Sequence, residues 1–161
     1  IRPHPYAPFD MTTFENNWVR VFPKGGGRPD MDNTRQDYFN SLHYSAAVIG
    51  INTTGFLDAA IVDKPCITLM DDQMQYGQGA HFCYLINAGY IEVAQKRSET
   101  FEIIHRILNG VDSKLKNRRK FVHQFIRPVG MDIAASAVTA GAILAVGRAA
   151  KPEDWKQETH G

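Results

Sequence analysis

The sequence has few cysteines, no excess of charge of one sign and no apolar run long enough to cross a membrane. Cys66 and Cys83 each lie among apolar neighbours, in PCITL and HFCYL. We therefore expect two buried thiols in a reducing compartment rather than a disulfide. The net charge of +1 gives no overall attraction to nucleic acid or to an anionic membrane.

The most apolar late segment, at 134–147, is shorter than the roughly 20 residues that a membrane span needs. The opening IRPHPY does not have the pattern of a signal peptide. A cytoplasmic location is therefore the expectation.

Common nucleotide-binding and metal-binding motifs are also missing. The glycine-rich KGGGRPD at 24–30 lacks the GK[ST] ending of a P-loop and the spacing of a dinucleotide fingerprint, so we interpret it as a loop. No cysteine or histidine pair has the spacing of zinc ligands. Asp71 and Asp72 are adjacent in sequence, and adjacent side chains usually diverge. We expect neither a metal ion nor a resident cofactor.

The chain of 161 residues is about the length of one domain. It has no initiating Met, and Ile1 and Arg2 resemble the end of a strand, so we expect a piece of a longer protein that is shortened at its N-terminus. We predict one domain over 1–150 and a polar tail at 151–161.

Short apolar runs alternate with segments of helical period. Strands are predicted at 18–22, 47–51, 66–70 and 90–94, and helices at 34–45, 55–63 and 81–89. Three further helices, at 98–110, 113–126 and 135–150, follow without strands between them. The alternation predicts an α/β fold, with a Rossmann-like parallel sheet that has helices on both faces and is closed by the C-terminal helices.

The basic run KLKNRRK at 114–120 lies on one of these C-terminal helices. We predict a solvated basic face, with the apolar side chains packed inward: Leu115, Phe121, Val122 and Phe125. Peripheral contact with an anionic membrane surface is the alternative. No nucleic-acid motif accompanies the run, so we expect no nucleic-acid partner.

The turn after the apolar run at 47–51 consists of Asn52, Thr53, Thr54 and Gly55, and it opens directly into a predicted helix. Ligands of parallel sheets collect at the carboxyl ends of the strands, and the first N–H groups of a helix favour an anion. The two threonines add hydroxyl donors, and the glycine lets a ligand approach the backbone. The same residues are also ordinary helix caps. Both interpretations remain open, because one threonine can cap while its neighbour contacts a ligand.

The order of RPHP, a basic glycine-rich loop, DYFNSLHYSAAVIGINTTGFLDAAIVDKPCITL and QGAHFCYL resembles the C-terminal domain of bacterial GT-B fold glycosyltransferases. The closest resemblance is to enzymes that build capsular and other surface polysaccharides, and it covers residues 1–130. It implies one half of a GT-B fold, which holds a nucleotide-sugar donor while a separate N-terminal domain holds the glycan acceptor. It also implies transfer without a metal ion, and a fragment that is inactive without its acceptor domain.

The resemblance assigns phosphate contacts. His4, in the HP motif, would be the catalytic residue that stabilises charge on the leaving phosphate. Arg2 would add a bidentate phosphate contact, and Thr53, Thr54 and Gly55 match the Ser/Thr-rich turn that these enzymes aim at the phosphates. The alternatives are an exposed histidine in a turn between prolines and a surface arginine.

The resemblance also assigns contacts to the sugars. Asp58 stands where many of these enzymes carry a Glu that accepts hydrogen bonds from ribose hydroxyls, although a carboxylate in a first helical turn is also favoured by the helix dipole. Gln78 and His81 match a loop that borders the donor sugar. His81 is otherwise a histidine at a helix start that faces solvent.

Two other functions share parts of this pattern. A sugar-nucleotide epimerase of the same architecture would use the same phosphate turn and ribose carboxylate. A flavodoxin-like binding or signalling module would have the fold without the chemistry.

Overall fold

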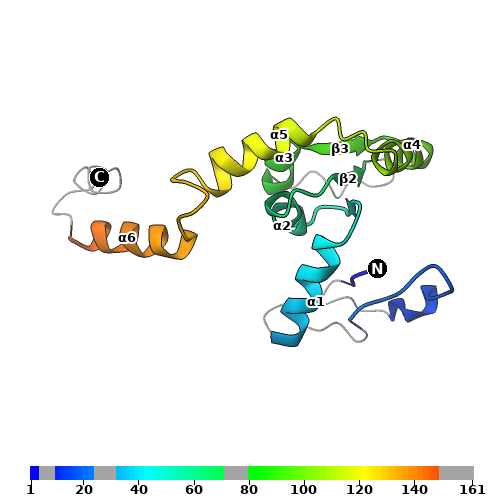
Figure 1. Ribbon diagram of the computed structural model, residues 1–161, viewed down its shortest axis with the longest axis horizontal. Helices are drawn as coiled ribbons and strands as arrows, with labels where there is room; N and C mark the ends of the chain where they lie inside the picture. Colours follow the sequence, from blue (N-terminus) through cyan, green and yellow to red (C-terminus); the bar gives the residue numbers. More distant parts are fainter. Residues whose placement is uncertain (4–9, 24–31, 71–79, 149–161) are drawn as a thin grey trace. The chain divides into compact units, whose positions relative to one another are not determined.

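A computed structural model of the chain describes residues 1–3, 10–23, 32–70 and 80–148. Where the sequence predicts one domain over 1–150, the contacts cluster in two compact units, the N-terminal unit Ile1–Ala46 and the C-terminal unit Ala47–Gly161. Figure 1 labels most of the helices and strands along the chain.

The N-terminal unit contains a short 3-10 helix, η1 (Met11–Phe14), and the predicted helix α1 (Asp32–His43). The predicted strand at 18–22 is wrong, because polar side chains take the N–H groups that a sheet would use. Asn16 Oδ1 accepts from the amides of Trp18 (2.8 Å) and Val19 (3.0 Å), and Glu15 accepts from Val21 (3.0 Å). The segment is therefore bent rather than extended.

One strand-like feature does remain in that segment. The amino group of Ile1 donates to the carbonyl of Arg20 at 2.6 Å, and the amide of Phe22 donates to the carbonyl of Ile1 at 2.9 Å. This pair of hydrogen bonds is the pattern of a parallel bridge between Ile1 and Val21.

The C-terminal unit is built on a three-stranded parallel sheet, which confirms the predicted α/β class. Its strands are β1 (Val48–Ile49), β2 (Cys66–Leu69) and β3 (Ile91–Ala94), in the order β1-β2-β3. In the register, Ile49 lies opposite Ile67, and Ile67 lies opposite Glu92. The helices α2 (Gly55–Ile61) and α3 (Ala80–Asn87) provide the two crossovers, as predicted.

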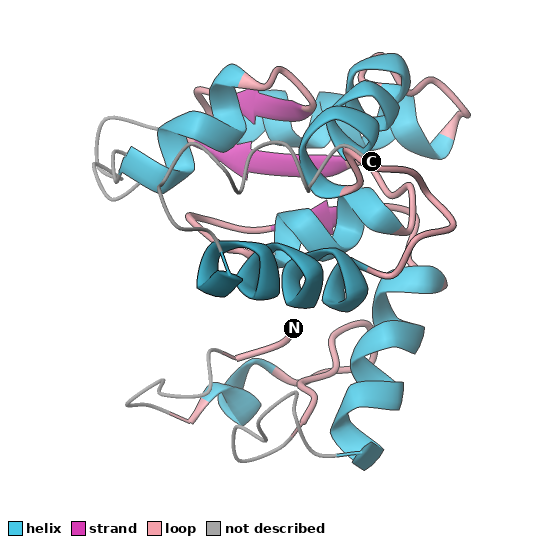
Figure 2. Cartoon of the chain, turned by 90° about the vertical axis from the view of Figure 1, so that its left-hand side faces the viewer, coloured by secondary structure: helices cyan, strands magenta, loops and turns pink. Residues whose placement is uncertain are grey.

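Helices cover both faces of β2, whose successive side chains point to opposite sides. Ile67 packs with Ile103 of α4 (Arg97–Leu108), whereas the Sγ of Cys66 lies 3.8 Å from the carbonyl oxygen of Phe56 on α2. Phe82 of α3 stacks on Phe56, with ring centroids 6.2 Å apart. One face therefore packs on α4 and the other on α2, with α3 joined to α2; Figure 2 shows the strands enclosed by helices.

The edge strand β1 is less covered than its sequence predicts. Its apolar run at 47–51 suggests burial on both faces, but Ile49 is 56% exposed and Ile51 is 44% exposed. In β2, by contrast, Cys66 and Ile67 are completely buried. The reason is the position of α4, which contacts β2 and β3.

The C-terminal part of the chain is helical, and its helices are broken at the predicted places. Gly110 (φ +80°) follows the end of α4, and α5 (Leu115–Phe121) continues as a π-helix, η3 (Val122–Ile126). Gly130 (φ +137°) lies in the turn before α6 (Ala135–Arg148). Among the described residues, no helix has both the length and the apolar character that a membrane crossing requires.

Candidate functional site

The turn at the carboxyl end of β1 is held by its own backbone and by Thr53. The amide of Gly50 donates to Ile67 at 3.1 Å, so the chain stays paired with β2 up to that residue. Asn52 then takes a left-handed conformation (φ +45°), which asparagine tolerates better than most residues. Thr53 Oγ1 accepts from the amide of Gly55 at 3.1 Å, and α2 begins there.

Gly50 is a determinant of this turn that sequence reasoning missed. A Cβ at this position would lie 2.7 Å from Cγ2 of Thr53 and 3.4 Å from a ring carbon of Phe56. Any side chain would therefore displace Thr53, whose hydroxyl accepts from the first amide of α2. The available signal was a glycine inside an apolar strand, which often marks close approach of another group.

The two threonines have different environments. The Thr53 hydroxyl is bonded to the helix start, whereas Thr54 is exposed. Within the part of the chain that the structure describes, no hydrogen bond is made by the Thr54 hydroxyl or donated by the amide groups of Thr53 and Thr54. The turn therefore has one hydroxyl and two N–H groups that other residues of the described chain do not use.

The predicted site residues other than Arg2 fall into three groups. Asn52, Thr53, Thr54, Gly55 and Asp58 lie together in the C-terminal unit, where Asp58 is exposed in the first turn of α2. His81 lies in the first turn of α3, and its side chain is outside what the structure describes. His4 and Gln78 lie outside the described residues.

Arg2 belongs to the N-terminal unit, where it packs against aromatic rings. Its guanidinium carbon lies 4.9 Å from the ring centroid of Tyr38 and 5.7 Å from that of Phe22, within the range of a cation–π contact. Partial burial lowers the pKa of Arg2 from its usual value, and the guanidinium also donates to Ser41 at 3.5 Å. These contacts give Arg2 a structural role in this unit.

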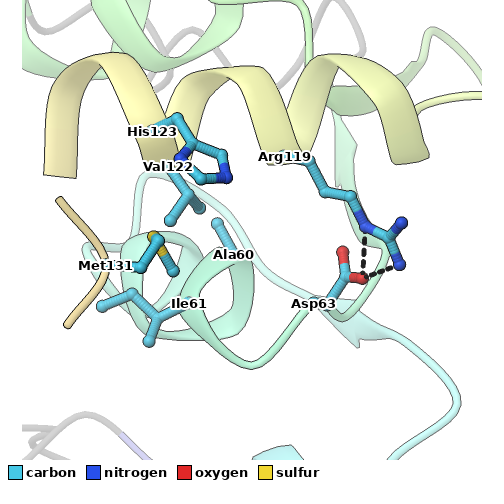
Figure 3. Close-up of a pocket in the computed structure, with 7 residues that line it drawn as sticks. All are labelled: Ala60, Ile61, Asp63, Arg119, Val122, His123 and Met131. Carbon is cyan, nitrogen blue, oxygen red and sulfur yellow. Dashed lines mark hydrogen bonds and ion pairs between the residues drawn. The ribbon is translucent and has the colours of Figure 1, made fainter. Parts of the chain in front are cut away.

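A second polar cluster, the ion cluster, is formed by Arg118, Arg119, Asp63 and Asp112. Arg118 is completely buried, and its guanidinium donates to Asp63 Oδ1 at 2.9 Å and to Asp112 Oδ2 at 2.6 Å. Arg119 donates to the other oxygen of Asp63 from Nε (2.9 Å) and Nη2 (2.8 Å), as Figure 3 shows. The prediction that the basic run at 114–120 is simply a solvated face is therefore wrong at Arg118.

The ion cluster lies near the amino ends of the strands, whereas the turn at 52–55 lies at the carboxyl end of β1. The helix α2 starts after the carboxyl end of β1 and must return to the amino end of β2, because the two strands are parallel. Asp63 comes directly after this return, with φ +57°. The cluster thus ties the loop before β2 to α5 and to the loop before α5.

The ion cluster makes stability depend on pH. Desolvation raises the pKa of Asp63, but hydrogen bonds from Arg119 and Arg118 outweigh it and hold the pKa below its usual value. The stabilisation is therefore present above about pH 4 and is lost as the pH falls through the folded-state pKa. We expect the urea midpoint to fall more steeply between about pH 5 and pH 3 in the unmodified chain than in Asp63→Asn. Equal slopes would contradict the assignment.

A shallow cavity of about 200 Å³ lies beside the ion cluster. It is lined by Ala60, Ile61, Asp63, Arg119, Val122, His123 and Met131. Its walls are mainly apolar, with charged groups on one side, as Figure 3 shows. This cavity does not include the turn at 52–55, so it and the predicted phosphate contacts lie at opposite ends of the strands.

The two cysteines have different environments. Burial raises the pKa of Cys66 to about 12, so its thiol stays protonated. Cys83 is exposed on α3, which corrects the prediction that both are buried. Within the described residues, no three histidine, cysteine or acidic side chains group as metal ligands would.

Comparison with protein-family models, with curated proteins and with solved structures gave no match. The α/β class of the C-terminal unit therefore rests on its own sheet and helices. The resemblance to GT-B glycosyltransferases remains an expectation from the sequence, and the activity is a proposal.

Proposed function

We propose that the chain is the donor-binding domain of a glycosyltransferase that moves a sugar from a nucleotide-activated donor to a glycan in surface polysaccharide synthesis. The observation that carries the proposal is the turn after β1, where Thr54 is exposed and its hydroxyl and the amides of Thr53 and Thr54 make no hydrogen bond within the described residues at the start of α2. The parallel sheet supports it, because ligands of such sheets bind at the carboxyl ends of the strands.

The turn suits a phosphate with a ribose beside it. A phosphate accepts hydrogen bonds from the Thr54 hydroxyl and from the amides of Thr53 and Thr54. Asp58 lies three residues after Gly55, about 5 Å along the helix axis. At that spacing its exposed carboxylate accepts hydrogen bonds from ribose hydroxyls, which are the neutral donors next to the phosphate in a nucleotide.

The contribution of these groups to the reaction is electrostatic. During transfer, the bond between the anomeric carbon and the phosphate oxygen breaks, and the oxygen of the acceptor hydroxyl bonds to that carbon while its proton passes to a base in the acceptor domain. The nucleotide leaves with additional negative charge, which fixed N–H and O–H donors stabilise. In this proposal His4 contacts the same phosphate, and Gln78 and His81 border the donor sugar.

A nucleotide titration of the 161-residue chain tests the proposal. UDP, CDP, CMP and GDP are titrated in turn, with binding followed by NMR shifts of the amides at 52–58. We expect Thr54→Val to weaken the nucleotide that binds by about 10-fold or more, since a hydrogen bond to a charged group contributes about 1.5–3 kcal/mol. His4→Ala should also weaken it.

Thr100→Val is the matched control. The hydroxyl of Thr100, in the first turn of α4, donates to the carbonyl of Lys96 and makes no contact with the turn at 52–55 among the described residues, so this variant should bind as tightly as the unmodified chain. The assignment is rejected if no nucleotide shifts the amides at 52–58, or if Thr54→Val and Thr100→Val bind equally well.

A further inference from the structure

The segment at 113–148 exposes an unusual amount of apolar surface. It contains the following large apolar side chains that are at least 36% exposed: Phe125, Val129, Met131, Ile133, Val138, Ile143, Leu144 and Val146. In α6, every residue is exposed except Ala142 and Ala145. Helices with apolar side chains on all sides are normally covered, so this segment has the character of an interaction surface.

The same segment is strongly basic, whereas the rest of the chain has more acidic than basic residues. Seven of the 18 Lys and Arg residues lie at 113–148, but only one of the 17 acidic residues does, Asp132. Arg118 is neutralised within the ion cluster, and the exposed cations include Lys116, Lys120 and Arg148. The near-neutral net charge of the whole chain therefore hides a strongly basic segment.

From these two observations we propose that residues 113–148 bind the surface of an anionic lipid bilayer. The basic residues of α5 contact the lipid headgroups, and the apolar side chains of η3, the following turn and α6 enter the boundary between headgroups and acyl chains. This interaction is separate from nucleotide binding at the turn after β1.

Charge and shape favour a bilayer over other occupants. Two copies of this segment placed face to face would bring like charges together, which opposes association. Nucleic acid would pair with the cations but would leave the apolar side chains exposed. An anionic lipid bilayer provides both a counter-charge for the cations and an apolar environment for the exposed side chains. Because it is fluid, it can surround a helix whose apolar side chains point in several directions.

The length of α6 indicates that the segment lies on the bilayer rather than across it. Its 14 residues extend about 21 Å. The hydrocarbon core of a bilayer is about 30 Å thick.

Vesicle co-sedimentation tests the proposal. The 161-residue chain is mixed with vesicles of phosphatidylcholine alone, or with vesicles that also contain phosphatidylglycerol. We expect binding to the anionic vesicles that weakens with added salt. Each exposed basic residue near a membrane contributes about 1 kcal/mol, so the double variant Lys116→Gln/Lys120→Gln should bind about 25-fold more weakly. Leu144→Asp should also weaken binding.

Two matched controls make the same chemical changes elsewhere in the C-terminal unit. Lys96→Gln/Arg97→Gln removes two exposed charges at the start of α4, and Phe101→Asp changes an apolar side chain that is 72% exposed on the same helix. Both should bind vesicles like the unmodified chain. Because every substituted side chain is exposed, circular dichroism and thermal melts should show that all variants fold.

Absence of binding to anionic vesicles overturns the proposal, and so does binding that the α5 and α6 variants leave unchanged. Equal binding to neutral vesicles overturns the role of the cations. If light scattering shows self-association that Leu144→Asp abolishes, without vesicle binding, the segment is an interface between copies and the proposal is wrong.

Discussion

Replacing Arg118 with methionine is expected to lower the free energy of unfolding by about 3–5 kcal/mol. Arg118 is completely buried, and its guanidinium is the shared partner of Asp63 and Asp112. Methionine fills a similar volume but leaves two carboxylates without their counter-charge. We expect the lower end of the range, because the side chains of Asp63 and Asp112 are 36% and 22% exposed, so water still solvates the two carboxylates in part. Urea unfolding at neutral pH measures the change.

Arg119→Met is the control for Arg118. Arg119 binds the same carboxylate, but its side chain is 64% exposed, and exposed ion pairs contribute about 0–1 kcal/mol. The triple variant Arg118→Met/Asp63→Asn/Asp112→Asn should recover part of the loss, since it removes the unpaired charges. If Arg118→Met costs no more than Arg119→Met, the ion cluster does not stabilise the fold.

Replacing Phe56 with alanine should have a comparable effect, about 3–5 kcal/mol. Phe56 is completely buried, stacks on Phe82 and lies beneath the backbone of Gly50. Its removal leaves a cavity where α2, α3 and the end of β1 meet. A thermal or urea unfolding curve gives the loss.

Phe101→Ala is the matched substitution for Phe56→Ala. The side chain of Phe101 on α4 is 72% exposed, so its removal should change the free energy of unfolding by no more than about 0.5 kcal/mol. Similar losses for the two phenylalanines would mean that the core does not lie where the structure places it. Phe56→Ala should also weaken nucleotide binding, because loss of the ring displaces the turn at 52–55, whereas Phe101→Ala should leave binding unchanged.

Local patterns were sufficient to predict most of the C-terminal unit. The runs CITLM and YIEVA form neighbouring parallel strands, and Gly89 (φ +72°) and Gly110 (φ +80°) end helices where glycine predicted an end. These signals are local: apolar runs of strand length, helical period and a residue without a Cβ. The parallel pairing followed from the alternation of strands and helices.

Three predictions from the sequence are wrong, and in each the cause is a contact with residues outside the segment concerned. The burial of Arg118 depends on Asp63, which is 55 residues away, and no local pattern distinguishes it from Lys116 or Lys120 on the same helix. The exposure of Ile49 depends on which strands α4 covers. The run WVRVF fails as a strand because Glu15 and Asn16 bind its amides.

The sequence predicted which residues form the polar turn, but not which contacts each of them makes. The polar turn after β1 was evident from its four small residues, and the structure adds that Thr53 binds the helix start while Thr54 faces solvent. Gly50 was missed because its importance comes from the close approach of Thr53. Arg2 was assigned to a phosphate from its position beside the HP motif, whereas its ring contacts to Tyr38 and Phe22 come from distant residues.

The left-handed backbone at Asp63 restricts which amino acids can occupy that position. Asparagine, aspartate and glycine adopt such a conformation most readily, while only aspartate and glutamate carry the negative charge that Arg118 and Arg119 require. Aspartate is the single member of both sets. Substitution should therefore be far less tolerated at this position than its partial exposure suggests, and solvent exposure by itself is a poor guide to mutational freedom in this protein.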